Sequence, residues 1–343
     1  MVRHKSTQPS ISDVARLAGV SLGTVSNVLN TPDRVKADTA ARVQQAIASL
    51  GFVRNDAARQ LKAGKSSAIG LVVLDTTNPF FAELAKGAED GAIDQGFQVL
   101  IGNSDHEKVR EDSHLKIFQE QRLSGVLLSP VENANSEVQA LRDVGTQVVI
   151  LDQKVSEEFC CSVSVDDIAG GQMAVQHLID QGKRKIAFVG GSLDIHQVAD
   201  RLTGATIAKE MADQSVTLET FRAKSQDVIS GRLIGNEILK LPESRRPDGV
   251  FAANDLLAVG LLQAFALDNR ISIPDDIALI GYDDIDFAAT AVVPLSSIKQ
   301  PAKLIGSTGL ELLVDEIENA KSHKHQQVTF HPELIVRAST SGN

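Results

Sequence analysis

The sequence predicts two structural parts: a small all-α head that contains a helix-turn-helix, and an α/β core built from two doubly wound parallel-sheet lobes. Two observations predict this division. Apolar residues recur with helical spacing through the first 50 residues, whereas from Ala68 short apolar runs alternate with amphipathic stretches. The sign of the charge changes at the same place, because residues 1–65 carry ten Lys and Arg against four Asp and no Glu.

The charge of the two parts indicates which of them binds nucleic acid. Residues 1–65 have a net charge of +6 and the rest of the chain has −16, so the total of −10 conceals a basic head. A basic surface attracts phosphate and an acidic one repels it, and DNA contacts are therefore expected in the head. Aromatic residues make up only 4% of the chain, which argues against a surface that stacks single-stranded bases.

The sequence also predicts the compartment. No apolar run reaches the roughly 18–20 residues that a membrane-spanning helix needs, and the polar start, Met1 to Lys5, has no apolar segment behind it. We expect a cytoplasmic, nucleoid-associated protein without membrane contact. The two cysteines, Cys160 and Cys161, are adjacent, where a disulfide would strain the backbone, so free thiols are expected.

Three short helices are expected in the head. Ser10 and Asp13 have the spacing of a capping box, and the apolar stripe behind them predicts a helix over 11–18. Gly19 then supplies a tight turn and Ser21 caps a second helix, as in a helix-turn-helix. A third helix is expected over about 37–50. The inward-facing residues of the second and third helices are Val25, Val28, Leu29, Val43, Ala46, Ile47 and Leu50.

Residues 11–21 and 24–30 resemble the amino-terminal signature of LacI/GalR-type transcriptional regulators. The resemblance implies that the second helix lies in the major groove of double-stranded operator DNA, where Leu22, Gly23, Thr24 and Asn27 face base edges. It places Ser21, Ser26 and Asn30 near phosphates. Many members have Arg at the position of Asn27. Because an Asn amide pairs best with adenine, the operator is expected to differ from those of such members.

Residues 55–65 are Ala-rich and basic, and at under about 12 residues they are too short for a stable isolated helix. The resemblance implies a hinge helix that orders on DNA as a dimer pair. Leu61 would then wedge between base steps in the minor groove, with Lys62 beside it at the DNA. An inert linker is the alternative, although linkers favour Gly and Ser over Ala, Arg and Leu.

From Ala68 the chain predicts alternating strands and helices, which implies parallel sheets with helices on both faces. The strands are expected near 68–74, 98–102, 125–128, 147–151, 162–165, 185–189, 249–252 and 277–282. The expected domains are a helix-turn-helix domain over 1–54, a hinge helix and linker over 55–67, and an effector-binding and dimerisation core over 68–338. Within the core, the expected lobes are about 68–165 with 299–325, and about 166–298 with 326–338.

Polar residues follow most of these strands, at the edge where open α/β sheets bind ligands. They are Asp75 to Asn78, Asn103, Ser129, Asp152, Asp166, Asn254, Asp255, Asp283 and Asp284. Two lobes that close over so many hydrogen-bonding groups favour a small polyhydroxylated ligand. For any single residue, a helix N-cap or turn role is an equally good interpretation.

Residues 68–338 resemble the sugar-binding fold shared by LacI-type cores and periplasmic ribose-type binding proteins. The resemblance implies that hydroxyls of a small sugar are bound by Asn78, Asp152, Arg201, Asn254, Asp283 and Gln300, with Phe80 and Phe81 against the ring. Gln153 stands where the binding-protein pattern has a second Arg. We therefore expect a repressor released from a palindromic operator by ribose or a related pentose, nucleoside or polyol.

Other functions fit the sequence less well. An enzyme or a cytoplasmic sugar-binding protein without a DNA role conflicts with the head, and no dinucleotide, G-x-S-x-G or Walker A motif occurs. His323, His325 and His331 are expected in a solvated loop, so neither a metal nor a cofactor is expected. A purine corepressor or a phosphorylated carrier protein could replace the sugar as the signal. The chain ends without further heptads, and a homodimer is expected.

Overall fold

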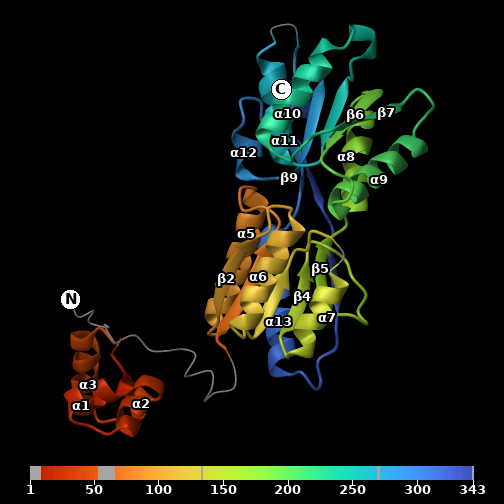
Figure 1. Cartoon of the computed structure of the whole chain (residues 1–343). Coiled ribbons are helices and arrows are strands. Elements are labelled where there is room, and N and C mark those ends of the chain that lie inside the picture. Colours follow the sequence, from red (N-terminus) through yellow and green to blue (C-terminus); the bar gives the residue numbers. More distant parts are fainter. Residues whose placement is uncertain (1–8, 53–65, 133, 269–270, 342–343) are drawn as a thin grey trace, which may run out of the picture. The chain divides into compact units, whose positions relative to one another are not determined.

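Within residues 9–52 the head has three helices and one 3-10 turn. The structure, a computed structural model, describes residues 9–52, 66–132, 134–268 and 271–341 (Figure 1). The elements of the head are α1 Ile11–Ala18, α2 Leu22–Asn30, η1 Pro32–Arg34 and α3 Ala37–Leu50. Val14, Val25 and Val43, one from each helix, are fully buried and form the centre of its core. The three predicted helices are thereby confirmed.

The expected capping residues fix the ends of these helices. Ser10 accepts a hydrogen bond from the backbone N–H of Asp13, and the Asp13 carboxylate accepts one from the N–H of Ser10, which completes the capping box. Gly19 ends α1 with a φ of +66°, in the left-handed region that glycine enters without a steric penalty. Ser21 caps α2 by accepting from the N–H of Thr24.

A second compact unit begins at Ser67 and contains both lobes of the core. The sheet of the first lobe has the order β11-β5-β4-β3-β1-β2, and its pairs are parallel. Its strands are β1 Ala68–Val73, β2 Gln98–Asn103, β3 Gly125–Leu128, β4 Gln147–Leu151, β5 Cys161–Val165 and β11 Gln327–Phe330. Its helices are α5 Pro79–Asp94, α6 Lys108–Glu120, α7 Asn135–Asp143 and α13 Ala302–Glu318.

Successive strand residues of this sheet point to opposite faces and build two apolar layers. Val149 and Leu151 pack with the residues of α5 and α13, whereas Val148 and Ile150 pack with those of α6 and α7. The same alternation separates the two cysteines, because Cys161 belongs to the first layer and Cys160 to the second. Both are free thiols, as expected.

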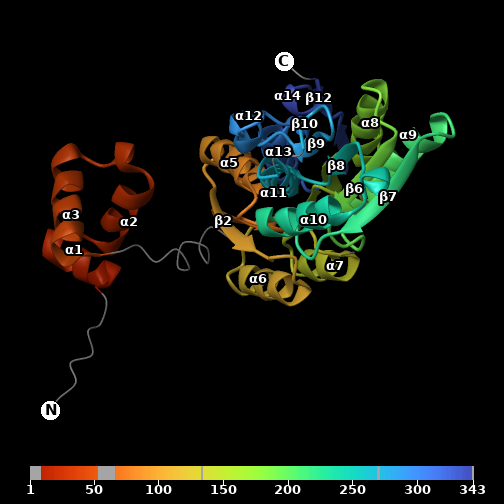
Figure 2. The ribbon, with the colours of Figure 1, turned by 90° about the horizontal axis from the view of Figure 1, so that it is seen from above.

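The sheet of the second lobe has the order β12-β10-β9-β8-β6-β7. Its strands are β6 Lys185–Gly190, β7 Thr217–Arg222, β8 Gly249–Ala252, β9 Ala278–Asp283, β10 Ser296–Lys299 and β12 Glu333–Ile335. Its helices are α8 Asp167–Asp180, α9 His196–Met211, α10 Val228–Lys240, η2 Glu243–Arg245, α11 Asp255–Ala266, α12 Asp286–Thr290 and α14 Ala338–Ser341. α8 and α9 cover one side of these strands, and α10 and α11 the other (Figure 2).

The last part of the chain differs from the prediction, which assigned all of 326–338 to the second lobe. β11 pairs in parallel with β5 of the first sheet, and only β12 joins the second, antiparallel to β10. A single extended segment thus adds an edge strand to each sheet in turn. Its extended pattern predicts a strand but not which sheet edge accepts it, so the expected boundary at 325/326 is wrong and the crossing lies at 331–332.

None of the helices in the described residues combines the length and apolarity needed to cross a membrane.

The helices of the core pack in pairs. In each of the pairs α5 with α13, α8 with α9, and α10 with α11, a glycine of one helix faces the backbone of the other, and the relation is reciprocal. These glycines are Gly87 and Gly306, Gly171 and Gly204, and Gly231 and Gly260. The contact between paired helices is therefore main chain against main chain.

An added methyl group tests this packing at Gly204, where it would lie 2.0 Å from the carbonyl oxygen of Ile168. Alanine favours the helix by about 1 kcal/mol, but no side-chain rotation relieves a clash with backbone, so α8 and α9 must separate. We expect Gly204→Ala to lower the free energy of unfolding of the core by a net of about 1–3 kcal/mol, measured by urea denaturation. Thr203→Ala, at an exposed neighbour, should change it by less than about 0.5 kcal/mol. Equal stability of both variants would contradict the close packing.

Candidate functional site

The exposed face of α2 carries the residues expected to contact DNA. Val25 and Val28 are buried against the other helices of the head, so the opposite side of α2 faces solvent, where Leu22 is 51% exposed and Asn27 is also exposed. The structure gathers on α2 and at its N-cap the residues Ser21, Leu22, Gly23, Thr24, Ser26, Asn27 and Asn30.

Several of these polar groups already have partners within the head. The Ser21 and Thr24 hydroxyl oxygens lie 2.9 Å apart, and Asn30 Nδ2 donates to the backbone oxygen of Ser26 at 2.7 Å. The side-chain amide of Asn27 forms no hydrogen bond with the described residues, so its donor and its acceptor both remain available. Asn27 is therefore the group on α2 best suited to bond a base edge. The other two predicted DNA contacts, Leu61 and Lys62, lie outside the described residues.

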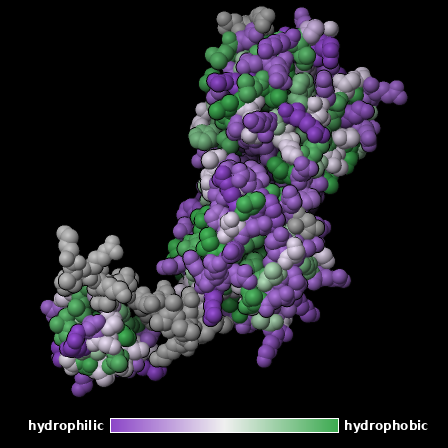
Figure 3. Space-filling view, viewed as in Figure 1, coloured by the Kyte–Doolittle hydropathy of each residue, from purple (hydrophilic) through white to green (hydrophobic). Residues whose placement is uncertain are grey.

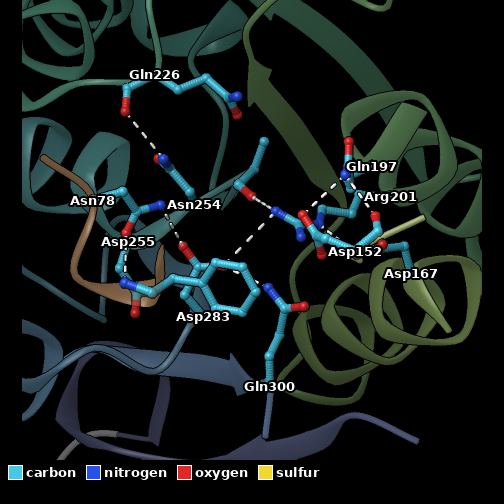
Figure 4. Close-up of polar contacts among 12 residues, drawn as sticks. Asn78, Asp152, Asp167, Gln197, Arg201, Gln226, Asn254, Asp255, Asp283 and Gln300 are labelled. Atoms are coloured by element: carbon cyan, nitrogen blue, oxygen red, sulfur yellow. Dashed lines mark hydrogen bonds and ion pairs between the residues drawn. The ribbon is translucent and has the colours of Figure 1, made fainter. Parts of the chain in front are cut away.

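A cavity lies between the two lobes of the core, at the carboxyl ends of their strands. The predicted residues that line it are Asn78, Phe80, Phe81 and Asp152 from the first lobe and Arg201, Asn254 and Asp283 from the second. Gln300, at a crossing between the lobes, reaches the same group by donating from Nε2 to Asp283 Oδ1 at 2.7 Å (Figure 4). The predicted effector residues thus converge from eight positions spread over more than 200 residues.

Asp283 of the second lobe is hydrogen-bonded to the first lobe. It ends β9 with a φ of +108°, which turns its carboxylate toward the cavity. Asn78 Nδ2, from the first lobe, donates to Asp283 Oδ2 at 3.2 Å, while Asn78 Oδ1 caps α5. Asn78 is therefore a helix N-cap, as one interpretation held, and its amide nitrogen also forms a hydrogen bond in the cleft. Burial raises the pKa of Asp283 to about 6, although the Arg201 charge and the donors Asn78 and Gln300 oppose this.

A second contact between the lobes involves Asp152. Gln197, in the first turn of α9, donates from Nε2 to the backbone oxygen of Asp152 at 2.6 Å and to its Oδ2 at 2.9 Å. Asp152 Oδ1 is buried and has no hydrogen-bond partner among the described residues. Burial, reinforced by the nearby Asp167 carboxylate, raises the pKa of Asp152 well above its ordinary value. Asp152 thus has an unpartnered oxygen on the first-lobe side of the cavity, which accepts when the carboxyl is ionised and can donate when it is protonated.

Arg201 is the buried cation of the site. Its Nε donates to Asp167 Oδ1 at 2.7 Å, and one Nη donates to the backbone oxygen of Ala253 at 2.7 Å. The guanidinium stacks on Tyr282, with its central carbon 3.7 Å from the ring centroid. The same nitrogen that bonds Ala253 lies 3.9 Å from Asp283 Oδ1. The side chain is therefore held rigidly, with its fork directed at the cavity's acidic side.

The remaining predicted residues shape the wall of the cavity. Phe80 and Phe81 are buried and pack edge to face, with centroids 5.0 Å apart. Asn254 Oδ1 caps α11 and its Nδ2 donates to the backbone oxygen of Gln226, so its amide is largely engaged. Asp255, predicted as a polar neighbour, instead lies away from the cavity and accepts from Ser297 and from the N–H of Ile285.

Sequence reasoning missed several residues of the cleft. His106, Gln197 and Gln226 line the cavity, and Asp167 holds Arg201. For two of them the signal was present, because His106 and Gln226 follow a strand within four residues, at the edge where ligands bind. The prediction considered mainly the first polar residues after each strand, whereas left-handed turns such as that at His106, with a φ of +58°, carry later residues back to the edge.

Known proteins match this chain over nearly its whole length. The family model for bacterial regulatory proteins of the lacI family matches residues 10–55, and that for a periplasmic binding protein-like domain matches residues 175–340. The chain is 31% identical to the HTH-type transcriptional repressor PurR of Photobacterium profundum, covering 96% of this chain and 98% of the relative. It is 31% identical to the ribose operon repressor of Escherichia coli, covering 96% and 99%.

A solved structure also matches the core. A LacI family transcriptional regulator from Enterococcus faecium with bound ribose is 30% identical, with a TM-score of 0.72, over 80% of this chain and 99% of that one. Both lobes and the cleft fall within the compared fold. The two repressors, in contrast, match this chain through both the head and the core.

The raised pKa of Asp283 predicts how stability depends on pH. Between its ordinary value of 3.8 and about 6, the folded core holds a proton that the unfolded chain has released, so stability is higher at low pH and falls as the pH rises through this window. We expect the free energy of unfolding to fall by up to about 3 kcal/mol across this window because of Asp283, at about 1.4 kcal/mol per pKa unit. Urea denaturation of the parent and of Asp283→Asn at pH 4 to 7 measures the difference. The exposed Asp286→Asn should keep the parent's slope, and a slope unchanged in Asp283→Asn would contradict the assignment.

Proposed function

The chain belongs to the lacI family of bacterial regulatory proteins, and from this premise we propose that it is a repressor that binds a palindromic operator as a dimer and is released by a small sugar. The chain is a DNA-binding transcriptional regulator and not an enzyme. This follows from the family and from the two repressors that it matches over nearly their whole length. We place its action at the bacterial chromosome, in the cytoplasm.

One observation carries the choice of a sugar: polar side chains of both lobes converge on a single cavity with hydrogen-bonding capacity to spare. Asp152 Oδ1 and Gln300 Oε1 are buried acceptors without partners among the described residues. Carboxylates and amides bond vicinal hydroxyls, and the Arg201 fork donates to sugar oxygens. Phe80 and Phe81 offer aromatic surface to the C–H bonds of a ring.

Ribose or a related pentose is our first choice of effector. The Enterococcus faecium regulator binds ribose, and the Escherichia coli relative is a ribose operon repressor. The residues proposed to contact the effector are Asn78, Phe80, Phe81, Asp152, Arg201, Asn254, Asp283 and Gln300, joined by Gln197. Because the small cleft is already bridged by hydrogen bonds between the lobes, it suits a compact ligand.

Exposed apolar side chains support a dimer formed through the core. Ile93, Leu100, Ile101, Val109 and Ile117 are exposed around β2, α5 and α6 of the first lobe. β2 is also an edge strand, and Figure 3 shows apolar surface on this side of the lobe. Scattered single apolar residues are normal, but a set around one sheet edge marks an interaction surface. Because a two-fold dimer presents two copies of α2, the operator should be a palindrome. We propose that Leu61 and Lys62 contact the centre of this operator.

The DNA side of the proposal is tested at Asn27, after selection of the bound sequence from random duplexes. Asn27→Ala should weaken binding to the selected operator by about 1–3 kcal/mol and leave binding to random DNA nearly unchanged. Asn30→Ala, proposed at a phosphate, should weaken both by similar factors. Titration by fluorescence anisotropy at fixed salt measures the six affinities, those of the parent and both variants on each DNA. Equal losses on both DNAs for Asn27→Ala would remove it from the base-reading set.

The effector side is tested by calorimetry with ribose, other pentoses, hexoses, polyols and nucleosides. Arg201→Ala should abolish sugar binding, because buried carboxylates lose their counter-ion, and the variant should stay on the operator when sugar is added. Arg222→Ala, at an exposed arginine, should bind and respond like the parent. Sugar binding that survives Arg201→Ala would contradict the site. A response to a purine base and to none of these ligands would replace the sugar with a purine as the signal.

A further inference from the structure

A cluster of metal-binding residue types lies in the first lobe, at the edge of the sheet away from the cleft. It combines Cys161, the first residue of β5, with Glu316 near the end of α13 and His323 in the connection to β11. The ligand atoms of these three residues lie within 4.8 Å of one another. Cys161 Sγ and His323 Nε2 are 3.2 Å apart. Because tetrahedral zinc holds its ligands at about 2.0–2.3 Å, small movements suffice to place all three around one ion.

Of the three histidines expected in a solvated loop, His331 is exposed as the sequence predicts, whereas His323 and His325 are largely covered. The His323 side chain is only 2% exposed, and the fold sets it beside a cysteine and a carboxylate that are distant in sequence. For His323 the expectation is wrong because the connection after α13 folds back across the start of β5. His325 lies in the same loop: its Nδ1 donates to the backbone oxygen of Glu157 at 2.8 Å, and its Nε2 accepts from Arg142 at 3.0 Å.

Further contacts fix the positions of His323 and Cys161. His323 Nδ1 lies 2.5 Å from Asp315 Oδ2, which fixes the ring so that Nε2 faces Cys161. Carboxylates orient zinc-binding histidines in this way. Cys161 Sγ accepts from the N–H of Gln326 at 3.3 Å, a bond that also stabilises a thiolate.

The unpartnered oxygen of Glu316 points to a missing ligand. Glu316 is 3% exposed, and its Oε1 pairs with Arg142 at 3.0 Å. Its Oε2 is buried and has no hydrogen-bond partner among the described residues. A buried carboxylate oxygen without a partner is costly, and a cation would satisfy it. The surface hollow lined by Asp315, His323 and His325 supplies an entry path.

We propose that Cys161, Glu316 and His323 bind a thiophilic divalent cation, Zn²⁺ first, which ties the end of α13 and the following loop to β5. Soft sulfur with imidazole and carboxylate selects zinc over magnesium or calcium. The thiol proton leaves on binding, so thiolate and carboxylate neutralise the ion's charge. A water from the hollow takes the fourth position, as in zinc sites with three protein ligands.

Zn²⁺ titration of the full chain, stripped of metal by a chelator and competed with a chromophoric chelator, tests this site. We expect one tightly bound Zn²⁺ per chain, a higher melting temperature with Zn²⁺, and loss of both in Cys161→Ser and Glu316→Gln. Cys160→Ser is the matched control and should bind like the parent, because Cys160 packs on the opposite face of the sheet. Asp315→Asn, at an exposed positioning residue, should weaken binding about 10–100-fold.

A second measurement decides the question if a variant does not fold. Co²⁺ bound to the parent should give the thiolate-to-cobalt charge-transfer band and the intense visible bands of tetrahedral coordination, and Cys160→Ser should retain them. Absence of the charge-transfer band in the parent, or Zn²⁺ affinity unchanged in Cys161→Ser and Glu316→Gln, would overturn the proposal and leave a thiol–imidazole hydrogen bond beside an ion pair.

Discussion

The ion pair of Arg201 with Asp167 controls the charge of the whole cleft. Asp152, Asp167 and Asp283 are all buried there, and Arg201 is the cation that faces them among the described residues. Losing one partner of a buried pair costs about 3–5 kcal/mol, because the remaining charge has no counter-ion. The stacking on Tyr282 and the bond to a backbone oxygen fix the guanidinium, so its charge stays at one place beside these carboxyl groups.

The groups that would hold a ligand bond one another in this structure. Asn78 with Asp283 and Gln197 with Asp152 each join one lobe to the other. A ligand that enters therefore exchanges these bonds for its own, and the gain lies in the acceptors that remain unsatisfied. Since a ligand shifts an equilibrium only by its differential affinity, the strength of these bridges determines how strongly any effector can bias the lobes.

Local chemistry made much of the fold predictable. The capping box at Ser10, the turn at Gly19 and the apolar runs of the parallel strands each have a short-range cause, and the structure has them in the predicted places. What failed depends on contacts distant in sequence. The strand at 327–330 could have joined either sheet, and His323 is buried only because β5 and α13 meet beside it. Gln197 was missed because its neighbour Asp152 lies 45 residues earlier.

The reciprocal glycines of the paired helices determine how this core can move. Because main chain meets main chain at Gly171 and Gly204, and likewise at Gly87 and Gly306, neither lobe has loose side chains between its paired helices that could repack. Change is left to the connections near Asp166, at Gln300 and at 331–332, which run between the sheets. A ligand in the cleft would therefore act on the angle between two stiff lobes, and a small change of that angle would move most the parts that lie farthest from the connections.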